Sequence, residues 1–491
     1  MAEKGEKEEE GVELEMVQKA LDYALMHGLV VRPKVGQCKD NVRQGMALQM
    51  PFALLPTLYP SRTFQQVCQV EPIFHRLVYR MSQDLSYLTT ALASTSQSDV
   101  FTRKMVTIAL QASELRSREP HRRPSGFLGL WRSDYMIQEN PSNPTLLKAC
   151  LIEYNTISVS FPGLSPKVAG LHQYLVNSFK PAELNDAILP ANNSTEKFVT
   201  AMYKAFELYR DPTALVLFVV QPEERNLYDQ KLLSTGLEAR GVRTMRVGLG
   251  DIASHGVVDG KGRLLYADFP VAVVYFRAGY TPDDYPTEAE WKGRQMVEES
   301  NCIACPNVAT FLVGSKKVQQ LWATSGVLEK YLDAQEVRAV TACFVPIYSL
   351  DAREYSSTEE FEALLATFRE HPEKYVLKPQ REGGGNNFYD NALSDALDRM
   401  TNEELAGYIM MERIFPVTYS ATHVADGAAQ KLLSSGELGI YGALVADDSQ
   451  DPPPLWHSEA CGYLMRTKVV SNAEGGVSAG FAVLDSIALT E

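Results

Sequence analysis

The sequence predicts a mixed α/β protein with a parallel sheet in the middle of the chain. The first indication is a continuous apolar run at 215–220, which is typical of a strand buried on both faces. A helical pattern at 226–237 follows it, and then three further predicted strands at 243–247, 264–266 and 271–276. Because strands that alternate with helices favour a parallel sheet, we expect an α/β subdomain over 212–315.

The flanking segments are expected to supply other helices and strands. Apolar residues recur at helical spacing from Val12 to His27 and stop at Gly28, which predicts a helix. Breaker residues at 119–126 predict a loop. Further helices are predicted at 74–92, 99–117, 168–178 and 316–325, and further strands at 127–135, 151–156, 375–377, 408–414, 438–445 and 480–484. These patterns divide the chain into a charged tail (1–10), an N-terminal part (11–211), the subdomain (212–315) and a C-terminal part (316–491).

Composition limits the possible functions. The chain has 491 residues, 45% of them hydrophobic, which suffices for two or three structural units in one body. Its net charge of −14 argues against a nucleic-acid partner and against an anionic membrane surface. No run of 18 apolar residues is present, so no membrane span is expected. The acidic first ten residues favour a cytoplasmic protein, and a longer plastid precursor stays open.

The cysteines predict free thiols. Seven cysteines are too few for a disulfide scaffold. Cys302 and Cys305 form the one close pair, and a redox or metal role for them is an alternative, but no second such pair completes a zinc site.

A glycine-rich segment is the most informative motif: Tyr375-Val-Leu-Lys-Pro-Gln-Arg-Glu-Gly-Gly-Gly-Asn-Asn387. Three consecutive glycines suit a loop whose amides approach phosphate closely. A carboxylate beside phosphate needs a cation between them, so Glu382 predicts a Mg²⁺ contact. A flexible surface turn is the alternative.

Other polar patterns follow predicted strands. Glu153 and Asn155 are two residues apart on a strand and therefore share a face, where they could hold Mg²⁺ or simply face solvent. Arg132 could clamp a carboxylate or form a surface ion pair with Asp134. Glu224 begins a helix after a buried strand, at a place where α/β proteins bind ligands.

The segment from Lys378 to Asn387 resembles the glycine-rich loop of eukaryotic-type glutathione synthetases, and further matches run in order from Arg132 to Asp485. The resemblance implies an ATP-grasp fold, a homodimer, and ATP- and Mg²⁺-dependent joining of γ-glutamylcysteine to glycine through an acyl phosphate. It implies two Mg²⁺ ions per subunit, held by Glu153, Asn155 and Glu382. It makes Arg132 and Arg466 the catalytic residues.

The same resemblance assigns the binding residues. Contacts to γ-glutamylcysteine or glycine are implied for Arg132, Ser158, Ser160, Glu224, Asn226, Gln230, Arg277, Tyr280, Arg466, Val477 and Ser478. Contacts to ATP are implied for Lys316, Lys378, Gly383, Gly384, Gly385, Asn387, Met411, Glu412, Ile414, Glu437, Lys468 and Glu474.

One departure from the family pattern leaves the amine acceptor open. The segment Gly475-Gly-Val-Ser-Ala-Gly480 carries Ser478 where the family usually has alanine. A homoglutathione synthetase that uses β-alanine is therefore an alternative. A nucleotide-binding homologue without catalysis is a second alternative, although no implied metal ligand or phosphate-binding lysine is missing.

Overall fold

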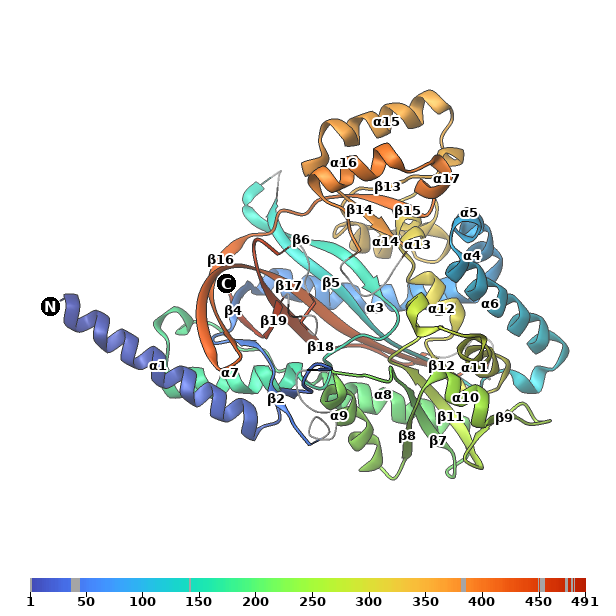
Figure 1. Cartoon of the computed structure of the whole chain (residues 1–491), viewed down its shortest axis with the longest axis horizontal. Helices are drawn as coiled ribbons and strands as arrows, with labels where there is room; N and C mark the ends of the chain where they lie inside the picture. Colours follow the sequence, from blue (N-terminus) through green and yellow to red (C-terminus); the bar gives the residue numbers. More distant parts are fainter. Residues whose placement is uncertain are drawn as a thin grey trace.

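A seven-stranded sheet forms the centre of the molecule, in the order β16-β3-β19-β18-β17-β5-β6 (Figure 1). The computed structural model describes residues 2–36, 45–140, 143–380, 386–448, 450, 455–472, 476, 477, 480 and 482–491. The strands of the sheet are β3 (Phe52–Ala53), β5 (Phe127–Asn140), β6 (Asn143–Asn155), β16 (Thr418–Ala425), β17 (Ala428–Ala446), β18 (Leu455–Val469) and β19 (Ala482–Asp485). The prediction of a mixed α/β fold is confirmed.

The central sheet is covered by helices on both faces. Alternate residues of β17 enter two different cores, because successive side chains of a strand point to opposite faces. Leu438 and Ile440 pack in the core that contains α3 (Ser61–Gln83), whereas Tyr441 and Ala443 pack in the core that contains α8 (Ser194–Tyr209). A strand buried in this way is a rigid support for the residues beside it.

A second sheet lies within the predicted subdomain at 212–315. Its strand order is β8-β7-β11-β10-β9, with β12 beside β11. Its strands are β7 (Leu215–Val219), β8 (Arg243–Val247), β9 (Gly256–Val258), β10 (Leu264–Tyr266), β11 (Phe269–Phe276) and β12 (Ile303–Cys305). Strands β8, β7, β11 and β12 are parallel, as the alternation of strands and helices predicts. All of β7 is buried.

A third sheet of three antiparallel strands, β13-β15-β14, stands above the central sheet in Figure 1. Its strands are β13 (Ile347–Ser349), β14 (Tyr375–Pro379) and β15 (Tyr408–Glu412). Leu377 and Met410 pack against α15 (Thr358–Glu370) and α16 (Asp390–Arg399) on one face. We call the three strands with α15, α16 and α17 (Asn402–Leu405) the lid.

The other α-helices surround these sheets. They are α1 (Ala2–Met26), α4 (Leu85–Ala91), α5 (Ala93–Ser98), α6 (Val100–Arg118), α7 (Ser165–Phe179), α9 (Leu227–Glu238), α10 (Leu249–His255), α11 (Glu288–Glu299), α12 (Val308–Val313), α13 (Lys316–Trp322) and α14 (Ala334–Thr341). Two short sheets pair β1 (Val30–Val31) with β2 (Leu48–Gln49) and β4 (Thr57–Pro60) with β20 (Ile487–Thr490).

Some element boundaries differ from the prediction. Helix α1 begins at Ala2, so it includes most of the segment that was predicted as a charged tail. The predicted helix at 74–92 is in fact α3 and α4, which meet at Asp84, and α3 already begins at Ser61. Strands β16 to β19 return to the central sheet although they follow the lid in sequence. The division of the chain at residues 211 and 315 stays a prediction.

Candidate active site

The Asp134 carboxylate accepts hydrogen bonds from three side chains on one buried face of the central sheet. Arg132 lies two residues before it on β5, so both side chains point to the same face. Arg132 donates to Asp134 through Nε at 2.5 Å and Nη2 at 2.7 Å. Arg466 of β18 and Asn155 of β6 also donate to the Asp134 carboxylate, each at 2.9 Å. The alternative of a surface ion pair is wrong, because Asp134 and Arg132 are buried.

Gly439 of β17 leaves the space in which the Arg132–Asp134 ion pair lies. A Cβ atom at Gly439 would lie 2.6 Å from Arg132 Cδ and 2.7 Å from Asp134 Oδ1. Real Cβ atoms do not approach other heavy atoms so closely. The two predicted catalytic arginines, Arg132 and Arg466, are therefore brought together by Asp134 in a space that β17 leaves open.

Glu153 forms a second charged centre, one strand away. It faces Asp134 across the pairing of β5 and β6, and Lys316 Nζ lies 2.7 Å from its Oε2. Burial acts to raise the pKa of the Glu153 carboxyl, but the charges of Lys316 and Lys378 outweigh this effect and hold that pKa well below its usual range. Lys378 comes from lid strand β14 and donates to the Ile152 carbonyl at 3.2 Å.

Helix α13 is fastened to β6 by Gln319, which fixes the position of Lys316. The Gln319 side chain accepts from the Tyr154 amide at 2.8 Å and donates to the Tyr154 carbonyl at 3.2 Å. The turn before the helix also lies close to β6, since a Cβ at Gly314 would be 2.2 Å from Thr156 Oγ1. Lys316 thus belongs to the body of the molecule and Lys378 to the lid.

The donor set of the predicted magnesium site fits that ion. Glu153 supplies a carboxylate and Asn155 an amide oxygen, and hard oxygen ligands of this kind suit Mg²⁺. The Asn155 amide group donates to Asp134, which leaves its oxygen as the atom available to a cation. No group of three or more His, Cys, Asp or Glu side chains in the described part of the chain is arranged to hold a metal. The third predicted ligand, Glu382, lies outside the described residues.

A loop with unusual backbone angles carries Ser158 and Ser160. Ser158 has φ 54° and Phe161 has φ 72°, values that are uncommon for residues other than glycine. Asp229 of α9 stabilises this conformation, because its carboxylate accepts from the amides of Phe161 at 2.8 Å and Gly163 at 2.7 Å. Strain of this kind is found at functional sites where the surroundings enforce it.

Arg277 binds the same loop from the end of β11. It is buried, and it donates to the Val159 carbonyl at 2.5 Å and to Ser160 Oγ at 2.8 Å. Three residues later, Tyr280 lines a cavity of about 20 Å³ together with Lys316. The predicted substrate residues Ser160, Arg277 and Tyr280 are therefore brought towards Lys316.

Glu224, Asn226 and Gln230 form a cluster after β7. Glu224 accepts from the Asn226 amide at 2.7 Å and from the Gln230 side chain. Asn226 and Gln230 are buried, and Asn226 Oδ1 and Gln230 Oε1 have no hydrogen-bond partner among the described residues. Buried acceptors without donors carry a free-energy cost, which a bound ligand would remove.

Two of the predicted adenine contacts, Met411 and Ile414, lie on the lid face that is turned to β6. Met411 packs with Cys150 of β6, and Ile414 lies against the same small core. Glu412 accepts from Tyr348 Oη at 3.1 Å on the other face of the lid sheet, where Tyr348 packs against the core of α15 and α16. The antiparallel register of β14 and β15 sets Lys378 opposite Ile409, two residues from Met411. This arrangement brings the predicted adenine and phosphate contacts onto neighbouring lid strands.

Other predicted residues lie on the central sheet or outside the described residues. Glu437 of β17 accepts from Arg466, and Lys468 is buried two residues along β18 from Arg466. Val477 is buried. The predicted positions that lie outside the described residues are Glu382, Gly383, Gly384, Gly385, Glu474 and Ser478.

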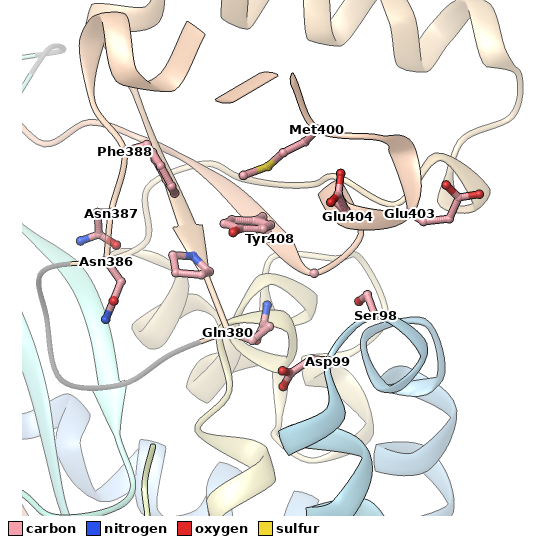
Figure 2. Close-up of a pocket in the computed structure, with 12 residues that line it drawn as sticks. Ser98, Asp99, Gln380, Asn386, Asn387, Phe388, Met400, Glu403, Glu404 and Tyr408 are labelled. Carbon is pink, nitrogen blue, oxygen red and sulfur yellow. The ribbon is translucent and has the colours of Figure 1, made fainter. Parts of the chain in front are cut away.

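A pocket of about 650 Å³ lies where β14 ends, at the junction between the lid and helix α6 (Figure 2). Gln380 and Asn387 line it from the lid side, and Asp99 lies across from them at the start of α6 (Figure 2). Its volume is that of a small-molecule site. One predicted nucleotide contact, Asn387, thus borders a pocket with walls from both lid and body.

Three residues that support the site were missed by sequence reasoning. Asp134 was noted only as a partner for a surface ion pair, and Asp229 and Gln319 were not noted. Each acts across a long sequence separation, from 65 residues in the contact of Asp229 with Leu164 to 332 in that of Arg466 with Asp134. A carboxylate or amide on the predicted buried face of an element is the one sequence signal that could have indicated them.

The cysteines give no support to a thiol-based site. The six cysteines in the described part of the chain are free. Burial raises the pKa of Cys302 and of Cys305 to about 12, so both stay protonated thiols near neutral pH and are poor nucleophiles or metal ligands.

Comparisons with known proteins identify relatives of this chain. Residues 10–489 match the family model described as eukaryotic glutathione synthase, ATP binding domain. The chain is 42% identical to the chloroplastic glutathione synthetase of Arabidopsis thaliana, over 96% of this chain and 85% of that protein. It is 36% identical to the glutathione synthetase of Homo sapiens, over 96% of both chains.

A solved structure shows the same fold. The chain is similar to a glutathione synthetase-like effector from Globodera pallida, with a TM-score of 0.74 and 20% identity, over 98% of this chain and 97% of that one. Together with the family model and the relatives, the site geometry leads to one assignment. The chain belongs to the eukaryotic glutathione synthase family.

Proposed function

We propose that the protein joins γ-glutamylcysteine to glycine, with hydrolysis of ATP to ADP and phosphate. The observation that carries the proposal is the row of charged groups on β5, β6 and β18. Arg132 and Arg466 meet there at Asp134, and Glu153 binds Lys316 one strand away. Such a row can hold a carboxylate at one end and phosphate groups at the other.

The arginines would orient the reacting carboxylate. Glycine cannot displace oxide from a carboxylate, so the terminal carboxylate of γ-glutamylcysteine must first accept the γ-phosphoryl group of ATP. Arg132 and Arg466 can hold that carboxylate in line with the phosphate, since both guanidinium groups are fixed by Asp134. The glycine amine then attacks the acyl phosphate, and phosphate leaves.

The lysines would bind the phosphates from two sides. Lys316 comes from α13 on the body and Lys378 from β14 on the lid. When Mg²⁺ is bound, with Glu153 and Asn155 as ligands, it supplies positive charge that stabilises the transferring phosphoryl group. Lid closure would exclude water, which would otherwise hydrolyse the acyl phosphate.

An oxygen-transfer experiment tests the reaction. γ-Glutamylcysteine labelled with ¹⁸O in the cysteine carboxylate is incubated with ATP, Mg²⁺ and glycine, and the released phosphate is analysed by mass spectrometry. An acyl-phosphate route moves one labelled oxygen into the phosphate. Phosphate release without label, or release that does not require both γ-glutamylcysteine and glycine, would contradict the proposal.

Glycine is the acceptor that the comparisons favour. The relatives from Arabidopsis thaliana and Homo sapiens are both named glutathione synthetases, which gives no support to the β-alanine alternative. The same phosphate assay with glycine, β-alanine and serine measures the preference directly, and we expect kcat/KM to be highest for glycine.

We further propose a homodimer that works in a reducing compartment, the cytoplasm. Six free cysteines in the described part of the chain support a reducing environment. None of the described helices is long and apolar enough to cross a membrane. Light scattering of the purified protein should give twice the chain mass of 54.6 kDa, and a fluorescent fusion should separate cytoplasm from plastid.

A further inference from the structure

Three neighbouring parallel strands of the second sheet end at one edge, and each brings charge to it. Phe218 of β7 is paired with Arg246 of β8, and Val219 of β7 is paired with Phe276 of β11. Arg246 is the last residue but one of β8, whereas Arg277 directly follows β11. The segment that carries Glu224 follows β7. Carboxyl ends of parallel strands are where α/β proteins bind ligands.

Arg277 is largely occupied at this edge, and its Nε is the only one of its nitrogen atoms that has no partner within the described residues. Two of its nitrogen atoms already donate to the loop, to the Val159 carbonyl and to Ser160 Oγ. Burial lowers the pKa of Arg246 to about 10, and among the charges that act on it Glu224 raises this pKa while Arg32 and Arg277 lower it. These charged groups are therefore close enough to affect one another.

The unpartnered atoms at the edge are of two kinds. Arg246 Nη1, Arg32 Nε and Arg277 Nε are buried donors that have no hydrogen-bond partner within the described residues. Asn226 Oδ1 and Gln230 Oε1 are buried acceptors in the same condition. An α-amino-acid head group complements both kinds, because its carboxylate accepts hydrogen bonds and its ammonium group donates them.

We infer that Arg246 binds the α-carboxylate of the γ-glutamyl residue, with Arg32 beside it. The inference rests on the proposed function, because it concerns the far end of the same substrate. Arg32 follows β1, and its position is fixed by backbone contacts: its amide donates to the Arg225 carbonyl at 3.1 Å, and Arg225 Nε donates to the Arg32 carbonyl at 3.2 Å. Arg277 then holds the loop of Ser158 and Ser160 with two nitrogen atoms, and only its Nε is left to assist Arg246.

The test compares Arg246→Gln with Arg243→Gln, a matched control on the same strand. Arg243 is exposed, three residues from Arg246, and its guanidinium lies 3.9 Å from the centre of the Phe269 ring. Each variant is assayed with γ-glutamylcysteine and with 4-aminobutanoyl-cysteine, an analogue that lacks only the α-carboxylate. Phosphate release and thermal unfolding are measured for every protein.

We expect Arg246→Gln to raise the KM for γ-glutamylcysteine by about 10- to 100-fold, the loss expected for a hydrogen bond to a charged group. Neither the KM for ATP nor the KM for the analogue should change, and Arg243→Gln should behave like the wild type. An equal rise for both substrates would make Arg246 a structural residue and overturn the inference. An unchanged KM for γ-glutamylcysteine would also overturn it.

Two further results keep the test decisive. If Arg246→Gln does not fold, Arg246→Lys keeps the charge and should give an intermediate KM for γ-glutamylcysteine, again with no change for the analogue. If the wild-type protein releases no phosphate with γ-glutamylcysteine and glycine, the proposed function itself fails and the inference falls with it.

Discussion

Replacing Asp134 by asparagine tests the organisation of the charged row with almost no change in side-chain shape. Oδ1 of Asp134 accepts one hydrogen bond from Arg132, whereas Oδ2 accepts from Arg132, Arg466 and Asn155. An amide has one accepting oxygen, so its best orientation keeps the three bonds at the Oδ2 position and turns an N–H group towards Arg132 Nε. At least one charge-assisted hydrogen bond and the negative charge are lost.

The magnitude follows from the burial of these groups. Removal of one partner from a buried ion pair costs about 3–5 kcal/mol of unfolding free energy. With an unfolding entropy of about 2.1 cal/mol/K per residue, a chain of 491 residues has about 1 kcal/mol/K in total, so Tm should fall by about 3–5 °C. Because Arg132 and Arg466 lose their common anchor, kcat/KM for γ-glutamylcysteine should fall by about 100-fold or more.

The assay combines phosphate release with calorimetry, and Asp259→Asn is the control. Asp259 is paired with Arg263 at 2.8 Å on the surface, where an ion pair contributes about 0–1 kcal/mol. The control should therefore change neither Tm nor kcat/KM appreciably. If Asp134→Asn is indistinguishable from Asp259→Asn in both measurements, the anchoring role of Asp134 is refuted.

Three other substitutions test separate parts of the structure. Glu153→Gln removes the charge paired with Lys316 and should lower kcat by about 100-fold or more in the phosphate assay, with a weaker response to Mg²⁺ titration; wild-type kcat would exclude a role in metal binding. Burial raises the pKa of Asp485 from 3.8 to about 7, so protonation of Asp485 stabilises the fold, fully below pH 3.8, and this contribution is lost as pH rises through 7. Between pH 5.5 and 8 the wild type should therefore lose about 2 kcal/mol of unfolding free energy relative to Asp485→Asn. This loss is measured as a shift in the difference between the two Tm values, and a difference that stays constant would contradict the raised pKa. Gly314→Ala sets a Cβ against Thr156 and should raise the KM for ATP about tenfold by displacing Lys316, with recovery when Thr156→Ala is added; no recovery would locate the defect elsewhere.

The sequence predicted the elements whose signal is local. Strand β7 was predicted to within one residue, because a continuous apolar run carries its own signal. Strand β8 was predicted with its observed bounds from its place after the helical pattern at 226–237. Strand β18 was not predicted. Its 15 residues mix polar and apolar types, and its position comes from pairing with β17 and β19, which no local pattern records.

The candidate site divides in the same way. Residue types at short spacing, such as Glu153 and Asn155, were found because two residues on one strand share a face. The contacts that organise them were not found. Gln319 acts on Tyr154 over 165 residues of chain, and such a contact depends on how helix α13 docks on the sheet.

The position of Glu153 has a consequence for the order in which ligands bind. The Glu153 carboxylate forms an ion pair with Lys316 of the body and interacts electrostatically with Lys378 of the lid. It therefore neutralises the two positive charges that the ATP phosphates need. Phosphates that engage Lys316 would free this carboxylate, which is also the proposed ligand of a divalent cation. Nucleotide and cation should therefore strengthen each other's binding, and by the same factor, since a coupling free energy between two equilibria is reciprocal. The lid would then close when nucleotide and cation are both bound. With only one of them bound it would stay open, and that ligand could dissociate.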